Sequence, residues 1–275
     1  MSAAELPAWS LPDGSWPQVV DAAGWPAAAN RRWAFGDGRG TGVRVAVVDS
    51  GIDAAHPRVA GPVQRAVVVE PRDDGPPVVR AEEPVDVSGH GTACAGIIRS
   101  LAPDCLLTSV RVLGADLTGG GDVLLEGLRW AVRDGHDVVN LSLSTTKARY
   151  VPELHAIADE ASFAGCLLVC SAHNMPVESY PWRFSSVLSV ASHAEADPEA
   201  FFYNPDPPVE FHGRGADVEV AWTGGGTIVA TGNSFATPHL SGLAARVVGA
   251  HPGVTPFQLK TLLHLSADNV AAGAR

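Results

Sequence analysis

The chain has 275 residues, of which 46% are hydrophobic and 18% are charged, so a large buried core is expected and extended disorder is not. The formal net charge of −11 argues against nucleic-acid binding, which depends on Lys and Arg neutralising phosphates. An acidic protein instead favours neutral or basic peptides, weakly and in a salt-dependent way. No apolar run approaches the roughly 20 residues of a membrane-spanning helix, so no membrane association is expected.

The first 40 residues are rich in Pro, Gly, Ala and Trp, and their prolines interrupt any regular element. We interpret residues 1–40 as an arm on the surface of one domain that spans residues 41–275. Residues 1–14 lack the basic start and apolar stretch of a secretory signal, so a cytoplasmic protein is expected unless a natural leader is missing from this sequence. The tryptophans that would anchor the arm are Trp9, Trp16, Trp25 and Trp33.

After the arm, short β-branched apolar segments alternate with segments of helical period. The alternation predicts a mostly parallel sheet with helices on both faces, a three-layer α/β fold whose site lies at the carboxyl ends of the strands. In chain order, the pattern predicts a strand at 43–49, a surface hairpin or loop at 61–83, a helix at 90–99, a strand at 106–113, a helix at 122–133, a strand at 137–143, a helix at 152–164, strands at 167–171 and 187–191, a helix at 234–249 and a last helix capped by Thr255.

The four cysteines, Cys94, Cys105, Cys166 and Cys170, form no CxxC pair and no cluster with the ligand spacing of zinc. Cys166 and Cys170 are four residues apart in a strand-like segment. A strand puts them about 13 Å apart on one face, too far for a disulfide. Buried free thiols are therefore expected, and no metal or cofactor is predicted.

Three segments contain residues whose side chains could take part in catalysis. Asp49 ends the first buried strand, a position where many α/β proteins have an Asp. His90 is flanked by glycines ahead of an apolar helix, a setting that the other nine histidines lack, although a lone histidine is more often structural. Ser234 begins a long helix, whose N-terminus suits a developing oxyanion, although a lone serine there is usually only an N-cap.

Together, Asp-Ser-Gly at 49–51, His-Gly-Thr at 90–92 and Gly-x-Ser-x-Ala-x-Pro-His at 232–239 resemble the signatures of the subtilase family. They occur in that family's order, Asp then His then Ser, which differs from the order in trypsin-like and α/β-hydrolase enzymes. The resemblance runs from about residue 43 to the end. It implies a serine endopeptidase, acting on peptide or protein substrates through an acyl-enzyme.

The resemblance also implies the catalytic roles. Ser234 is the expected nucleophile, His90 the general base, and Asp49 the group that orients and stabilises the imidazole. Asp53 is the rival carboxylate, but it lies beyond Gly51 and does not match the motif position. His239 is the rival imidazole, but it lies inside the serine helix and matches a packing position of the family's pattern.

Further positions match the family's oxyanion hole and substrate cleft. Asn174 follows an apolar strand, as does the family's side-chain oxyanion donor, and the N–H of Ser234 is the expected second donor. Residues 140–145 resemble the wall strand that pairs with the peptide, and 117–119 resemble the opposite edge. The expected substrate-binding residues are Leu117, Thr118, Gly119, Ser142, Leu143, Ser144 and His173.

Several side chains depart from the family's pattern. Ser144 and Thr145 replace glycines at the end of the wall strand, and His173 replaces a glycine before the oxyanion asparagine. Asn233 replaces a threonine before the nucleophile and leaves part of the oxyanion environment open. These changes predict a restricted pocket that accepts small or polar residues; the alternative is that His173 points to solvent at the rim.

Two parts of the family's pattern are missing. The helix after His90 runs directly into residues 102–104 without the calcium-binding insertion, so no calcium site is expected there. About 40 residues of this sequence precede the first strand, so the family's usual inhibitory prodomain is not expected within it. We therefore interpret the chain as a restricted processing protease, by analogy one that cuts leader sequences from peptide precursors. The alternatives are a degenerate subtilase that binds peptides or a partner subunit, and acyl transfer to an amine.

Overall fold

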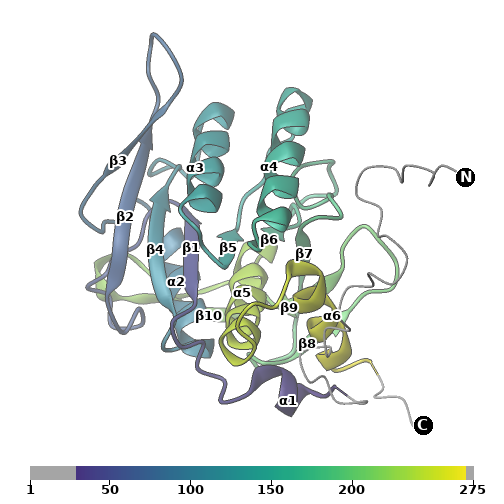
Figure 1. Cartoon of the computed structure of the whole chain (residues 1–275). Coiled ribbons are helices and arrows are strands. Elements are labelled where there is room, and N and C mark those ends of the chain that lie inside the picture. Colours follow the sequence, from purple (N-terminus) through teal and green to yellow (C-terminus); the bar gives the residue numbers. More distant parts are fainter. Residues whose placement is uncertain (1–28, 271–275) are drawn as a thin grey trace, which may run out of the picture.

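The computed structural model describes residues 29–270, and at its centre these residues form a nine-stranded sheet (Figure 1). The strand order is β3-β2-β4-β1-β5-β6-β7-β9-β8, and only the two edge strands β3 and β8 pair antiparallel to their neighbours. The strands are β1 (Arg44–Asp49), β2 (Val63–Glu70), β3 (Val78–Ala81), β4 (Leu106–Arg111), β5 (Val138–Leu141), β6 (Leu167–Ser171), β7 (Leu188–His193), β8 (Phe201–Tyr203) and β9 (Phe211–Arg214).

Helices cover both faces of this sheet (Figure 1). The helices α2 and α5 pack against each other and on one face, with α1 and α6 against α5, while α3 and α4 cover the other face. A separate antiparallel pair, β10 (Val218–Ala221) and β11 (Thr227–Ala230), leads into α5. The helices are α1 (Arg31–Phe35), α2 (His90–Leu101), α3 (Gly121–Arg133), α4 (Val151–Phe163), α5 (Asn233–Ala250) and α6 (Pro256–Ser266), with short 3₁₀ turns at Ala148–Tyr150 and Thr223–Gly225.

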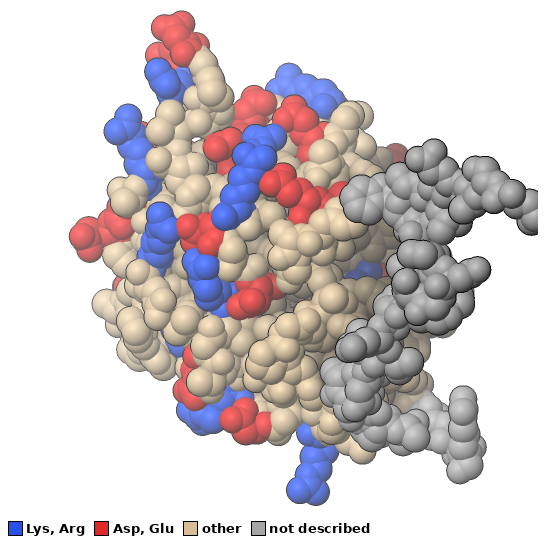
Figure 2. Space-filling view, in the orientation of Figure 1, with Lys and Arg blue, Asp and Glu red and all other residues tan. Residues whose placement is uncertain are grey.

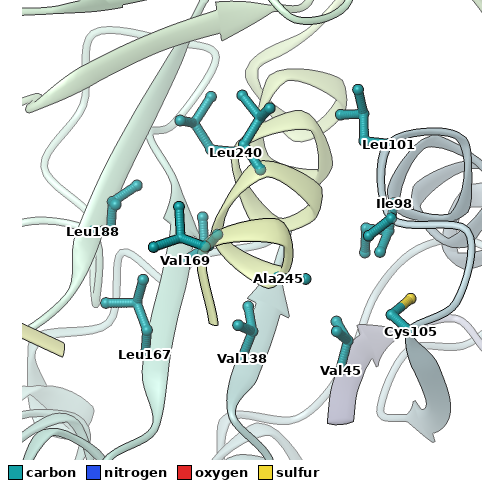
Figure 3. Packing of buried hydrophobic residues seen from close by; sticks show 14 of the residues in the cluster. Val45, Ile98, Leu101, Cys105, Val138, Leu167, Val169, Leu188, Leu240 and Ala245 are labelled. Atoms are coloured by element: carbon teal, nitrogen blue, oxygen red, sulfur yellow. The ribbon is translucent and has the colours of Figure 1, made fainter. Parts of the chain in front are cut away.

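The central strand β1 shows why the chain forms three layers. Its Val45 and Val47 belong to the apolar cluster under α2 and α5, whereas Ala46 and Val48 belong to the cluster under α3 and α4. All four side chains are fully buried. Successive residues of a strand point to opposite faces, so a run that is apolar throughout is buried on both. Figure 3 shows the first of these clusters, where Val45 and Val138 lie under the helices.

The predicted three-layer α/β fold is confirmed, and the long predicted elements match the observed ones within a few residues. The prediction for residues 61–83 was a surface hairpin or loop, and the structure corrects it, because part of this segment belongs to the central sheet. β2 and β3 do form a hairpin, but β2 also pairs parallel with β4 and extends the central sheet. The strands β8 to β11 were not predicted, since each has only three or four residues and lacks a distinctive pattern.

The described part of the predicted arm, residues 29–40, includes α1, which packs on α5 and α6. Trp33 lies against the ring of His251, with 4.2 Å between ring centroids. The other predicted anchors, Trp9, Trp16 and Trp25, lie outside the described residues. The division of the chain at residue 40 therefore stays a prediction.

All four cysteines are buried and free, as predicted. Burial raises the pKa of Cys105 to about 11 and that of Cys166 to about 12. These thiols are therefore protonated at neutral pH and unreactive as nucleophiles.

Opposite charges are interspersed over α3 and α4 (Figure 2). Arg129 pairs with Glu126 and Glu153, and Arg133 pairs with Glu160. Exposed pairs of this kind contribute little to stability, because water and salt screen their charges. The negative net charge is therefore not gathered into one acidic patch on this face. Among residues 29–270, no helix has the length and apolar character to span a membrane.

Candidate active site

The carboxyl end of β1 and the first residue of α2 form a hydrogen-bonded acid–imidazole pair. Nδ1 of His90 lies 2.8 Å from Oδ1 and 2.9 Å from Oδ2 of Asp49, which is fully buried. A carboxylate only accepts hydrogen bonds, so Nδ1 carries the proton of the neutral ring. Nε2 is then the unprotonated nitrogen, and the pair can take up a proton there.

Close backbone packing explains the glycines beside the histidine. A Cβ on Gly91 would lie 2.0 Å from the carbonyl oxygen of Gly51, so no side chain fits between α2 and the turn after β1. Gly89, which precedes the helix, has φ +106°, a conformation that L side chains rarely adopt. The Asp-Ser-Gly and His-Gly-Thr motifs therefore interlock and bring Asp49 and His90 together.

Asp86 fixes the turn that aims this histidine, and the sequence analysis missed it. Its Oδ1 accepts the N–H of Gly89 at 2.8 Å and the hydroxyl of Ser50 at 2.8 Å, and its Oδ2 accepts the N–H of Thr92 at 2.8 Å. The carboxylate thus caps the start of α2 from outside the helix. The only signal in the sequence is an Asp four residues before His90, which alone is too common to be informative.

Two opposing effects set the charge of the imidazole. Burial lowers the pKa of His90, but the charge of Asp49, its hydrogen bond and the charge of Asp86 together outweigh burial. The pKa of His90 is therefore raised above its ordinary value. The imidazolium that forms after proton transfer is stabilised by two nearby carboxylates.

Pro238 explains how the start of α5 is held. Ser234 is the second residue of this helix, and its carbonyl would normally accept the N–H four residues later. That residue is Pro238, which has no N–H, so the carbonyl is free. The hydroxyl of Ser142 donates to it instead, at 2.8 Å, and Asn140 Nδ2 donates to Ser142 Oγ at 3.1 Å.

This network changes the role of Ser142. The sequence analysis assigned Ser142 to the wall that contacts substrate, but its side chain is buried and holds the backbone of Ser234. The thiol of Cys94 lies 3.4 Å from the same hydroxyl and 3.9 Å from Oδ2 of Asp49. The end of β5, the start of α5 and the helix α2 thus meet in one buried polar network.

The first turn of α5 lies against the imidazole. The ring of Phe235, the residue after Ser234, is 5.4 Å from that of His90 between centroids. Within residues 29–270, Ser234 Oγ makes no hydrogen bond to His90 Nε2. Such bonds are often long in empty sites and tighten when substrate binds.

The amide of Asn174 has a defined orientation. Its Oδ1 accepts the backbone N–H of Asn233 at 2.9 Å, so its Nδ2 is the end available to a ligand. Nδ2 of Asn174 and Oγ of Ser234 each lie 3.4 Å from the point where a Cβ on Gly232 would be. The donor and the hydroxyl therefore face the same small space.

The two predicted edges of the substrate cleft line one pocket of about 240 Å³. Leu117, at φ +60°, is 41% exposed at one edge. The residues that line the pocket from the predicted edges are Leu117, Thr118, Gly119, Leu143, Ser144 and Thr145, joined by Lys147.

The end of the wall strand is closed by a segment that the sequence analysis did not single out. The hydroxyl of Ser144 bonds to that of Ser179 at 3.0 Å, and Thr145 exchanges two backbone hydrogen bonds of 2.9 Å with Tyr180. The ring of His173 bonds to its own loop, since its Nδ1 accepts the N–H of Met175 at 3.0 Å. No pattern in the sequence indicates the pairing of residues 144–145 with 179–180.

The rival groups are engaged elsewhere. The carboxylate of Asp53 accepts the N–H of Ala55 at 3.0 Å within its own turn. His239 is 3% exposed and its Nδ1 bonds to the carbonyl of Phe235; burial lowers the pKa of His239 to about 4.

One group of metal-ligating side chains lies close together in the described part of the chain, and it is the acid–imidazole pair with Cys94, whose ligand atoms are within 4.8 Å of one another. Burial raises the pKa of the Cys94 thiol well above its ordinary value, and Asp49 and His90 already bind each other. This donor set does not favour a metal.

The α/β fold brings four side chains to one edge of its parallel sheet: Asp49, His90, Ser234 and Asn174. Fold and site together are those of a hydrolase class in which a hydroxyl lies beside an acid–imidazole pair. Comparison with known proteins gives the family, because the model of the Subtilase family matches residues 40–275. The chain therefore belongs to the subtilase family, and the resemblance inferred from the three motifs is confirmed.

Relatives and solved structures agree with this assignment. A thermostable alkaline protease of Halalkalibacterium halodurans is 33% identical over 242 residues, which cover 83% of this chain and 63% of that protein. A subtilisin of Bacillus pumilus is 30% identical over 83% of this chain and 84% of that protein. The crystal structure of a cold-adapted subtilisin-like serine proteinase has a TM-score of 0.67 and 25% identity over 84% of this chain and 85% of that one. The chain thus spans less than two thirds of the first relative's length.

Proposed function

We propose that this protein is a serine endopeptidase with Asp49, His90 and Ser234 as its catalytic triad. The observation that carries the proposal is the buried Asp49–His90 pair, with an unprotonated Nε2, beside the helix start that bears Ser234. The protease relatives named above support the same activity.

In the proposed reaction, Oγ of Ser234 attacks the scissile carbonyl carbon while Nε2 of His90 takes the hydroxyl proton. Asp49 stabilises the resulting imidazolium. The new oxyanion accepts hydrogen bonds from Nδ2 of Asn174 and from the N–H of Ser234, which lies in the first helical turn and has no helical acceptor. His90 then protonates the leaving amine, and water hydrolyses the acyl-enzyme by the reverse proton path.

A fluorophosphonate probe tests this proposal, because it reacts only with an activated serine. Labelling should occur on Ser234 in the wild type and disappear in Ser234→Ala. Ser162→Ala, which changes a serine on α4, is the matched control and should label like the wild type. Labelling that survives Ser234→Ala would overturn the assignment.

We further propose that the pocket for the residue before the cut is restricted, as expected for a processing protease of precursor or leader peptides. Support comes from the end of the wall strand, where Ser144 bonds to Ser179 and Thr145 pairs with Tyr180. Ser144 and Thr145 add side chains at positions where the family has glycines, and these contacts hold the two residues in place. A peptide library should show preference for small or polar residues, and Ser144→Gly with Thr145→Gly should broaden it. A wild-type preference for Phe, Tyr and Leu would refute this part.

The second candidate function is a degenerate subtilase that binds peptides without cutting them, and the side chain of Ser144, at a position where the family has a glycine, favours it. This candidate predicts that the wild type binds peptides but does not react with the fluorophosphonate. The two functions are therefore separated by the same labelling experiment.

A further inference from the structure

Asn233 sits between the nucleophile and the oxyanion loop, and its side chain faces the loop. Its Oδ1 accepts the N–H of Ser192 at 2.9 Å, at the end of β7. Its Nδ2 donates to the carbonyl oxygens of Ala172 and His173, each at 3.2 Å. Both hydrogens of the amide are thus in use, and the side chain has no donor left for a substrate oxyanion.

The backbone of the same residue fixes the oxyanion donor directly. The N–H of Asn233 donates to Oδ1 of Asn174 at 2.9 Å. The two carbonyls held by the side chain belong to the residues immediately before Asn174. Asn233 therefore controls both the path of the loop and the orientation of the amide at its end.

We propose that Asn233 is the positioning residue of the oxyanion hole in this protein. It couples the start of α5, which carries Ser234, to the end of β6, which leads to Asn174. An asparagine is suited to this because it offers two donors and an acceptor to three backbone groups, whereas the threonine usual in the family has one hydroxyl. The inference rests on the proposed function and assigns a role to the residue that departs from the family's pattern.

The effect should fall on kcat. Oxyanion donors act on charge that exists only in the transition state, and a loop displaced by about 1 Å can cost about 100-fold in rate. Asn233→Ala is expected to lower kcat by about 10- to 100-fold with KM changed less than threefold. Asn233→Asp, which keeps the acceptor but loses both donors, should show a similar loss.

A double-mutant cycle with Asn174→Ala separates positioning from other effects. If Asn233 acts through Asn174, then Asn233→Ala should lower kcat by less than about threefold when Asn174 is already Ala. Asn204→Ala is the matched control, since Asn204 also makes three side-chain hydrogen bonds to backbone groups, between Asp206 and Val209, away from the site. Its kcat should equal that of the wild type.

Two results would overturn the proposal. One is an unchanged kcat in Asn233→Ala; the other is an equal loss in the wild-type and Asn174→Ala backgrounds, which would mean that Asn233 acts on Ser234 rather than on the donor. Melting temperatures of all variants check that the fold persists, and Asn233→Asp replaces Asn233→Ala if the latter does not fold. Failure of the wild type itself to hydrolyse peptides or to label would refute the proposed function instead.

Discussion

The buried His239 predicts how the stability of this protein depends on pH. Burial in the middle of α5 lowers the pKa of His239 from 6.5 to about 4. Above pH 6.5 the ring is neutral in both folded and unfolded chains. Between pH 6.5 and pH 4 only the unfolded chain binds the proton, so the free energy of unfolding decreases as the pH is lowered. A difference of this size corresponds to about 3 kcal/mol of unfolding free energy, a large part of the stability of a typical domain.

The prediction is best measured by urea unfolding of Ser234→Ala protein, which cannot digest itself, at several values between pH 7 and pH 4. His239→Asn in that background keeps a donor near Nδ1 for the carbonyl of Phe235 but cannot be protonated. It should lose about 3 kcal/mol less than its parent on acidification. His155→Asn, at an exposed position on α4, is the control and should behave like the parent. Equal losses in His239→Asn and its parent would refute the reasoning.

Three further predictions concern the site. Asp49→Asn should lower kcat by about 10⁴-fold, as expected when the imidazole loses the carboxylate that fixes its tautomer, and peptide hydrolysis within tenfold of the wild type would contradict the assigned role. Gly91→Ala should reduce kcat/KM by more than about 100-fold, because its Cβ would lie 2.0 Å from the carbonyl oxygen of Gly51. The control Gly226→Ala should have a kcat/KM near that of the wild type, because its Cβ would meet only the carbonyl oxygen of Thr223, at 3.9 Å. If the two variants lose activity equally, close packing at Gly91 is not the cause. EDTA should lower the melting temperature by less than about 10 °C, since α2 runs uninterrupted from His90 to Leu101, and a larger drop would reveal a structural ion.

Local patterns predicted the parts of the fold that are decided locally. The strand β1 has an apolar run from Val45 to Val48, which predicts burial on both faces. The last helix begins with Thr255 and Gln258, which form the observed capping box, and has a Pro in its first turn. The order of strands in the sheet is a different matter. β2 joins the sheet beside β4, whose sequence lies about 40 residues further along, and nothing in residues 63–70 specifies that pairing.

The residues singled out by motifs lie together, but those that hold them in place do not stand out in the sequence. Asp86 accepts hydrogen bonds from three sides at the start of α2, although an isolated Asp in a loop is unremarkable as a pattern. Ser179 and Tyr180 close the wall strand across a gap of 35 residues. Such contacts depend on the packing of distant segments, which a pattern of residue types along the chain does not encode.

Pro238 illustrates how a motif position acquires its physical meaning only in three dimensions. In sequence, a Pro inside a predicted helix is an irregularity, because one N–H of the helical hydrogen-bond ladder is missing. In the structure it frees the carbonyl of Ser234, and a free buried carbonyl needs a donor from another element. Ser142 supplies that donor from the end of β5 at 2.8 Å. Because Pro238 has no N–H, the end of β5 holds the backbone of Ser234 through Ser142. The segment that we expect to bind the peptide therefore also fixes the position of the serine that we expect to attack it.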